Sequence, residues 1–189
     1  RHRRMPRPVF FLLGFGLGLA FPHLSRAQHA RLEDDGTAAL VRSLIADPWL
    51  FALTILMVNT LKMGVLTIVA PSLIVPFSGI ALFAYWDVTT GMTLVPANDI
   101  GWVALIPHSL TLIVELQAYL LLLLGVYLLG KYSIRPRTVG AESHWQGYLR
   151  GLRDLGWLAL PALTLLVLGA VYEAFSLRYF VHPLAEWLL

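Results

Sequence analysis

The chain of 189 residues contains no cysteine, which excludes disulfide bonds and thiolate chemistry. Charged residues make up only 13% of the chain, about half of their share in a typical soluble domain. The sequence has no G-x-S-x-G elbow, no H-E-x-x-H motif and no glycine-rich phosphate loop. Its six histidines are scattered, without the spacing of a metal or haem site. We therefore expect neither an enzyme nor a bound metal or other cofactor.

Hydrophobic residues take the place of these features: they make up 58% of the chain, and the mean hydropathy is +0.71. A helix of roughly 20 apolar residues is long enough to cross a bilayer. The pattern predicts an all-α, polytopic helical bundle that forms a single membrane domain over residues 1–189. Five apolar segments are expected to span the membrane: 8–25, 49–70, 72–86, 101–130 and 155–179.

The fourth of these segments is too long for one straight span, and Pro107 lies within it. Proline breaks a helix or starts one, because it lacks a backbone donor. We therefore predict a re-entrant stretch over 101–106 and a spanning helix over 108–130. Such irregular backbone is tolerated at membrane depth only where protein or water covers it.

The basic residues predict the orientation in the membrane. They gather in the cluster Arg1 to Arg7 and in the loop 131–154, whereas the loop 87–100 has no Lys or Arg. Basic loops face the cytoplasm. With five spans, both basic clusters lie on the cytoplasmic side: the N-terminus and 131–154 are cytoplasmic, and the C-terminus is outside.

Two further segments have a recognisable pattern. Within the basic loop, Trp145, Tyr148 and Leu152 share one face of 141–153, which predicts an amphipathic helix at the cytoplasmic interface and a docking place for a cytoplasmic partner. The first apolar segment, with its basic start, resembles a signal peptide. We favour the other interpretation, in which this segment is a first membrane helix that is retained in the protein.

Six polar residues lie within the apolar segments and form a candidate intramembrane polar cluster: Asn59, Lys62, His108, Glu115, Gln117 and Glu173. An ionisable group in hydrocarbon is costly unless it is paired or hydrated. His108 and Glu115 lie two helical turns apart on one face. Lys62, Asn59 or His108 is expected to pair with Glu115, which would then be buried.

The cluster has two interpretations, a structural one and a relay of protons or ions. In the structural interpretation, His108 caps the helix after Pro107 and Lys62 extends toward the inner surface. Small residues at Gly14, Gly18 and Gly64 are expected to allow close packing between helices.

Several of these residues form a pattern that resembles the stage II sporulation protein M (SpoIIM) family of membrane proteins. Asn59 matches a polar asparagine of an early span, and Pro107-His108 matches the Pro-His start of a later one. That span continues with Glu-Leu-x-Ala, here 115–118, and the final span ends in Glu-Ala-Phe, here 173–175. The resemblance covers about 45–180.

Spaced glycines after the Glu-Leu-x-Ala motif, here Gly125 and Gly130, and a basic cytoplasmic loop complete the similarity. The chain departs from the family pattern at Ser109, where the family has glycine, and in the longer gap between His108 and Glu115. The Asn-Gly pair that follows the second span in the family is missing. The resemblance implies a membrane subunit that is not an enzyme and that scaffolds other proteins.

We therefore expect a structural subunit of a complex in the bacterial inner membrane. Its partners would be the lipid bilayer and other membrane subunits, and not nucleic acid. One alternative is a permease-like transporter subunit, with Lys62, Glu115 and His108 along a polar pathway and 141–153 coupled to a cytoplasmic ATPase. A second alternative is an accessory subunit of an electron-transfer or photosynthetic membrane complex.

Overall fold

The computed structural model describes residues 9–189, and every regular element in that range is helical. The basic cluster Arg1 to Arg7 lies outside the described residues. The elements in chain order are α1 (Val9–Ala20), α2 (Pro22–Asp34), α3 (Thr37–Leu44), α4 (Pro48–Met57), the π-helical segment η1 (Val58–Val69), α5 (Ala70–Ile74), α6 (Ser78–Thr93), α7 (Asp99–Ile134), the 3₁₀ turn η2 (Pro136–Val139), α8 (His144–Tyr179) and α9 (Val181–Leu188).

Three continuous helices are long and apolar enough to cross a membrane: Pro48–Ile74, which joins α4, η1 and α5, and then α7 and α8. The pair α1 and α2 is also apolar enough, but the chain bends by 105° between the two helices. Pro22 opens α2 at this bend, and proline lacks the N–H that would continue α1. The prediction of an all-helical fold is confirmed, and three helices are candidates to cross a membrane.

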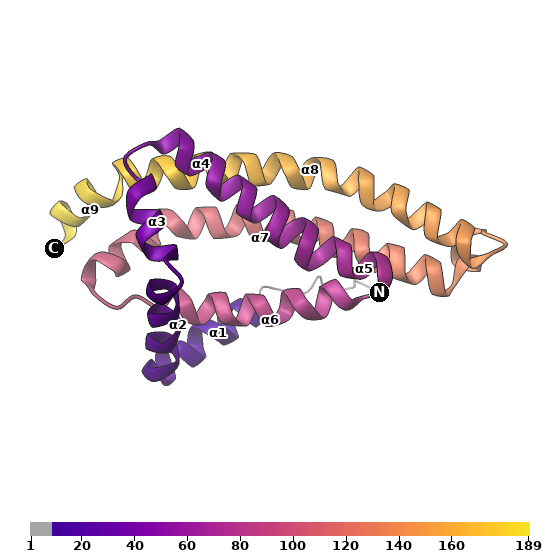
Figure 1. The fold of residues 1–189 in the computed structure, drawn as a ribbon, viewed down its shortest axis with the longest axis horizontal. Helices are drawn as coiled ribbons and strands as arrows, with labels where there is room; N and C mark the ends of the chain where they lie inside the picture. The colour runs from indigo at the N-terminus through magenta and orange to yellow at the C-terminus, as the bar shows by residue number, and fades with distance from the viewer. Residues whose placement is uncertain (1–8) are drawn as a thin grey trace.

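The chain runs back and forth between two ends of the molecule (Figure 1). At the hairpin end, on the right of Figure 1, lie residues 75–77 and 135–143. At the opposite end lie α2, α3, residues 94–98 and α9. The polar helices α2 and α3 cross this second end, which we call the α2–α3 end.

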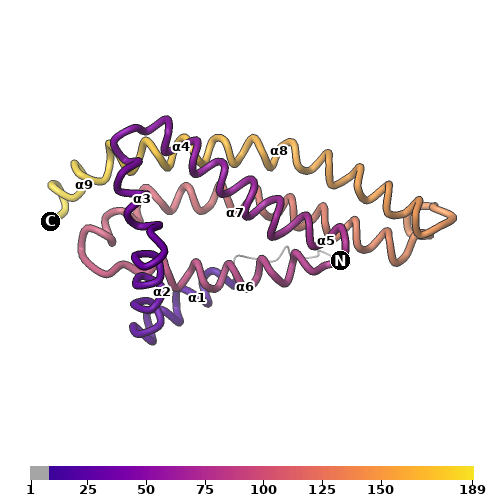
Figure 2. The backbone as a smooth tube through the Cα atoms, in the orientation of Figure 1, coloured from indigo at the N-terminus to yellow at the C-terminus, as the bar shows by residue number. Residues whose placement is uncertain are grey.

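Helices α7 and α8 form a long antiparallel hairpin. Gly125 of α7 meets Leu155 of α8, and Gly151 of α8 meets Leu129 of α7. Each helix has 36 residues and is therefore about 54 Å long, against roughly 30 Å for the hydrocarbon core of a bilayer. The hairpin projects beyond the other helices (Figure 2).

Helices α1 and α6 pack in parallel, through glycines. A Cβ atom added at Gly14 would collide with the backbone of Val88, and one at Gly91 would collide with the backbone of Phe11. Farther along the pair, a Cβ atom at Gly18 would lie 3.2 Å from Met92 Cα. Only residues without side chains allow two helical backbones to come this close.

Side-chain caps start the three long helices. Asp47 accepts hydrogen bonds of 3.1 Å from the backbone N–H groups of Trp49 and Leu50, at the start of α4. Asn98 accepts one of 2.9 Å from Gly101, at the start of α7. Ser143 opens α8 in the same way. Each cap satisfies a donor that has no partner within the helix.

The core lies along the contact of α7 and α8 with η1 and α6. Its buried side chains in the described range include Tyr119, Ile68, Leu129, Leu166 and Val126. A smaller cluster, with Leu44, Phe51, Ala52 and Ala174, joins α3 and α4 to the end of α8.

The second and third apolar segments have other bounds than the sequence predicted. The second helix does not end at Pro71 but continues to Ile74. The next helix is α6, Ser78–Thr93, and not 72–86. The turn between them contains Phe77, which has a positive φ of 69°. Its ring packs against Tyr127 and lies in the space left by Gly130, so side-chain packing and not local sequence preference sets this boundary.

Two expected breaks are absent. The predicted re-entrant stretch 101–106 is wrong, because α7 is one helix that contains Pro107. The predicted interfacial helix 141–153 is also wrong as a separate element, since its residues from His144 onward are the first part of α8. Gly147 and Gly151 on that part face α7. This packing keeps the segment in line with the rest of α8, along the α7–α8 hairpin. The last predicted segment, 155–179, is the rest of α8.

Candidate functional site

Glu115 lies on the buried face of α7 and is 9% exposed. The Nδ2 group of Asn59 in η1 donates a hydrogen bond to its Oε1 atom. A Cβ atom added at Gly169 of α8 would lie 3.3 Å from Glu115 Cγ, so this glycine leaves room for the carboxylate. Glu115 is therefore held among three helices, as the sequence predicted for a buried and paired carboxylate.

A second polar pair lies two turns nearer to the α2–α3 end. His108 Nδ1 of α7 is 3.3 Å from Glu173 Oε1 of α8, and the two side chains are 17% and 15% exposed. His108 therefore pairs with α8 and not with Glu115. The two pairs connect α7 to both of its long neighbours, with one contact to η1 and one to α8.

Two members of the predicted cluster point elsewhere. Lys62 and Gln117 are exposed, and the pairing of Lys62 with Glu115 is wrong. Lys62 points away from Glu115 because η1 winds as a π-helix. Bonds from i to i+5 place more residues in each turn, so Asn59 and Lys62 lie farther apart around this helix than in an α-helix. Asn59 can then face α7 while Lys62 faces outward.

The predicted packing glycines lie at helix contacts. Gly14 and Gly18 face α6, as described above. Gly64 in η1 faces α7: a Cβ atom added there would lie 3.3 Å from Leu122 Cδ1.

The sequence reasoning missed several buried polar residues, among them Asp87, Thr111 and Tyr119. These three are 3%, 0% and 1% exposed, and each has a side-chain oxygen without a hydrogen-bond partner in the described part of the chain. Asp87 was assigned to a loop because the expected span ended at residue 86. Thr111 gives a usable signal, since it follows His108 and precedes Glu115 at helical spacing.

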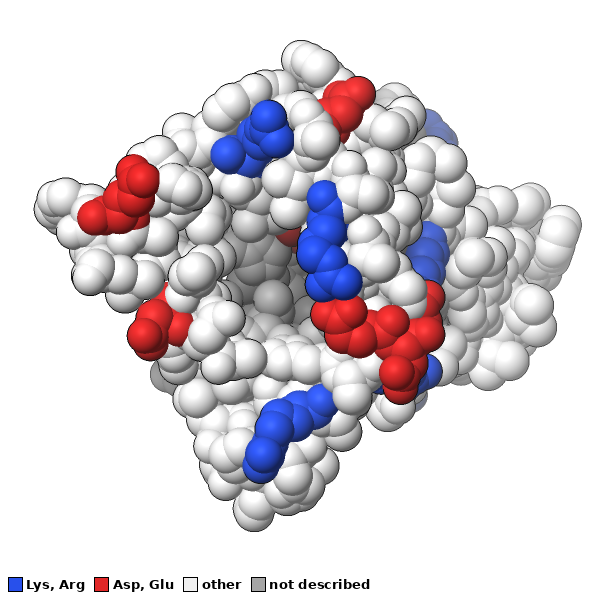
Figure 3. Space-filling model, turned by 60° about the vertical axis from the view of Figure 1, so that its left-hand side comes forward, with Lys and Arg blue, Asp and Glu red and all other residues white. Residues whose placement is uncertain are grey.

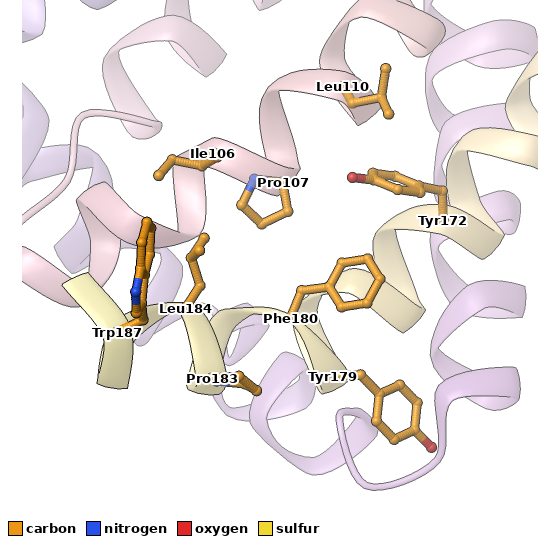
Figure 4. Close-up of a pocket in the computed structure, with 9 residues that line it drawn as sticks. All are labelled: Ile106, Pro107, Leu110, Tyr172, Tyr179, Phe180, Pro183, Leu184 and Trp187. Atoms are coloured by element: carbon orange, nitrogen blue, oxygen red, sulfur yellow. The ribbon is translucent and has the colours of Figure 1, made fainter. Parts of the chain in front are cut away.

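An apolar groove of about 750 Å³ lies beside the His108–Glu173 pair, where α7, α8 and α9 meet. Figure 4 shows the Tyr172 ring pointing from α8 across the groove toward Pro107, with Trp187 of α9 at the far side. The other lining residues are also apolar or aromatic: Ile106, Leu110, Tyr179, Phe180, Pro183 and Leu184. Its walls offer few polar groups, and none of them is charged.

The α2–α3 end is hollowed in its middle and carries charged side chains of both signs around the hollow (Figure 3). One ion pair of this region joins Arg42 Nη1 in α3 to Glu33 Oε1 in α2, at 3.0 Å. The hydrogen bonds from Arg42 lower the pKa of the Glu33 carboxyl group. Two anchors fix the end to the bundle: His29 contacts the Thr93 carbonyl oxygen at 2.8 Å, and Arg178 donates to Ile45 O at 3.1 Å.

Within residues 9–189, no three His, Cys, Asp or Glu side chains are grouped so that they could hold a metal ion. Comparison with protein-family models, curated proteins and solved structures gave no match to this chain. The similarity to the SpoIIM family therefore stays a prediction from the residues. What the geometry offers chemically is a set of buried proton donors and acceptors, connected across the helices of the bundle.

Proposed function

We propose that this chain is a structural subunit of a bacterial inner-membrane complex and that it has no catalytic activity of its own. The observation that carries the proposal is the α7–α8 hairpin, which is longer than a bilayer is thick and ends in a basic tip. Four exposed arginines lie on or near this tip: Arg135, Arg137, Arg150 and Arg153. Such a rigid arm suits the docking of another subunit.

The proposed topology has five crossings, by α1, the Pro48–Ile74 helix, α6, α7 and α8. The alternating direction of the long helices and the parallel packing of α1 with α6 support it. The basic tip would be cytoplasmic, together with the N-terminus, and α9 would lie outside. Helices α1 and α6 have 12 and 16 residues, so the bilayer would have to thin around them.

The paired polar side chains support a structural role as well. Asn59–Glu115 and His108–Glu173 join three helices. The resemblance to the SpoIIM family implies a scaffold independently of these pairs. Polar contacts between membrane helices stabilise their association, each by about 0.6 kcal/mol on average.

Isolation of the tagged chain from bacterial membranes tests the proposal. The wild type is compared with the tip variant Arg135→Gln/Arg137→Gln and with a control at the other end, Arg26→Gln. We expect membrane subunits to co-purify with the wild type and the control, and to be lost from the tip variant. If all three chains purify alone after mild solubilisation and cross-linking, the scaffold proposal is wrong.

A second candidate function is a permease-like transporter subunit. The row of polar groups from the half-buried Glu173 and His108 to the buried Glu115 favours it, because such groups often mark ion or substrate pathways. The same isolation separates the two candidates. A co-purified partner that hydrolyses ATP and drives uptake in liposomes supports the transporter, whereas partners without hydrolysis support the scaffold.

A further inference from the structure

A small, partly open cavity lies between α1, α6 and α7. Its volume is about 10 Å³, which is close to what one water molecule needs. The polar part of its wall consists of Asp87 and Thr90 of α6 with Glu115 and Tyr119 of α7. The rest of the wall is apolar: Phe11, Trp86, Leu112 and Leu116.

One oxygen atom on each of two of these side chains lacks a partner. Asp87 Oδ1 and the Tyr119 hydroxyl group have no hydrogen-bond partner within residues 9–189, although their residues are only 3% and 1% exposed. A buried polar group without a partner costs about 1–3 kcal/mol. A water molecule with two to four polar neighbours would remove this cost for both groups.

The charges around the cavity limit how the two carboxyl groups can ionise. Glu115 faces His108 and Tyr119 on its own helix, Glu173 on α8 and Asp87 on α6. The described part of α1 has no ionisable side chain, and Lys62 of η1 is exposed. His108 is already paired with Glu173. Two negative charges on one apolar cavity repel each other and lose hydration. We therefore expect only one of the two carboxyl groups, Asp87 or Glu115, to be ionised.

We propose that Asp87, Glu115 and Tyr119 form a binding site for one exchangeable proton and one water molecule, with the proton shared by the two carboxyl groups. The protonated carboxyl group donates to the water, and the water donates to the other carboxylate. The Tyr119 hydroxyl group donates to the water or to Asp87. The site therefore keeps one proton at neutral pH, and this proton can exchange with solvent. This inference does not depend on the scaffold role.

Infrared spectroscopy of the full chain in lipid nanodiscs tests the site. We expect a C=O band of a protonated carboxyl group at neutral pH, and a shift of this band in deuterated water. Asp87→Asn and Glu115→Gln should each shift the band, and the double variant should lose it. The matched control is Asp34→Asn, which changes an exposed carboxyl group of α2 and should leave the band as it is.

Either of two results overturns the proposal: a wild-type chain without the band at neutral pH, or a folded double variant in which the band is unchanged. Circular dichroism and the unfolding temperature report whether each variant is folded. Should the double variant not fold, Tyr119→Phe decides, because it removes one oxygen atom only. A folded Tyr119→Phe variant with an unshifted band also contradicts the site.

Discussion

Glu115 keeps its carboxylate inside the bundle because Asn59, on another helix, donates a hydrogen bond to it. This pair shows how a polar residue is accommodated between apolar helices. The amide of Asn59 supplies a donor without a second charge. A lysine at the same place would add the cost of burying an ammonium group.

Substitution of Glu115 separates hydrogen bonding from charge. Glu115→Gln should have a mild effect on stability, because the amide oxygen still accepts from Asn59. Glu115→Leu leaves the Asn59 amide unsatisfied and should cost about 1–3 kcal/mol of unfolding free energy. Unfolding in mixed detergent micelles measures both. The double variant Asn59→Leu/Glu115→Leu is the control and should recover part of the loss; equal effects of Gln and Leu would speak against the pair.

The exposed pair of Glu33 and Arg42 gives a pH-dependent prediction outside the membrane helices. Its hydrogen bonds lower the pKa of Glu33, so the stabilisation is present above the unfolded glutamate value of about 4.3. It is lost as the pH falls through the lowered folded value. Arg42→Gln should return the pKa of Glu33 toward its ordinary range, as measured by NMR titration. The effect on stability should be small, because the pair is exposed. An unchanged pKa would show that the contact does not form in solution.

At the scale of elements, the long helices continue through proline residues. Pro71, Pro107 and Pro161 all lie inside continuous helical stretches. A proline removes one backbone hydrogen bond. Irregular backbone facing hydrocarbon would leave several polar groups unpaired, so continuing the helix costs less. Helix continuity in this chain therefore follows from its surroundings.

The contact of α1 with α6 depends on glycine at one position and not at its neighbour. Gly14→Ala would push a methyl group into the Val88 backbone and should destabilise the chain by about 1–3 kcal/mol. Gly16→Ala is the matched control, since nothing lies within 4 Å of its added Cβ. It should be neutral or stabilise α1 by up to about 1 kcal/mol. Thermal unfolding in nanodiscs compares the two variants, and equal effects would contradict the packing.

The α7–α8 hairpin offers the same comparison on one helix. A Cβ atom at Gly151 would lie 2.6 Å from Leu129 Cα, whereas one at Gly156 meets nothing within 4 Å. We expect Gly151→Ala to lower the unfolding free energy by about 1–3 kcal/mol and Gly156→Ala not to lower it. If Gly151→Ala unfolds like the wild type, the two helices do not pack closely at this level.

At the scale of the whole molecule, the absence of cysteine makes topology directly measurable. Single cysteines are introduced at exposed positions: Glu142→Cys in the hairpin tip, and Glu186→Cys in α9. With five crossings, an impermeant thiol reagent applied to intact cells should label position 186 and not position 142. Permeabilised cells should show labelling at both and serve as the control. Labelling of position 142 from outside would reverse the proposed orientation.

By itself, the sequence determined that this chain is helical and rich in membrane-length apolar segments, because composition and the length of apolar runs suffice for that. It also identified His108 and Glu115 as residues on one face of a helix, since spacing along one helix fixes their relative direction. Only the tertiary structure decided which groups they meet. The rotation of one helix against its neighbour depends on side-chain packing along their whole contact. For this reason Asn59 and not Lys62 reaches Glu115, Glu173 reaches His108, and Asp87 of α6 lies on the same small cavity as Glu115.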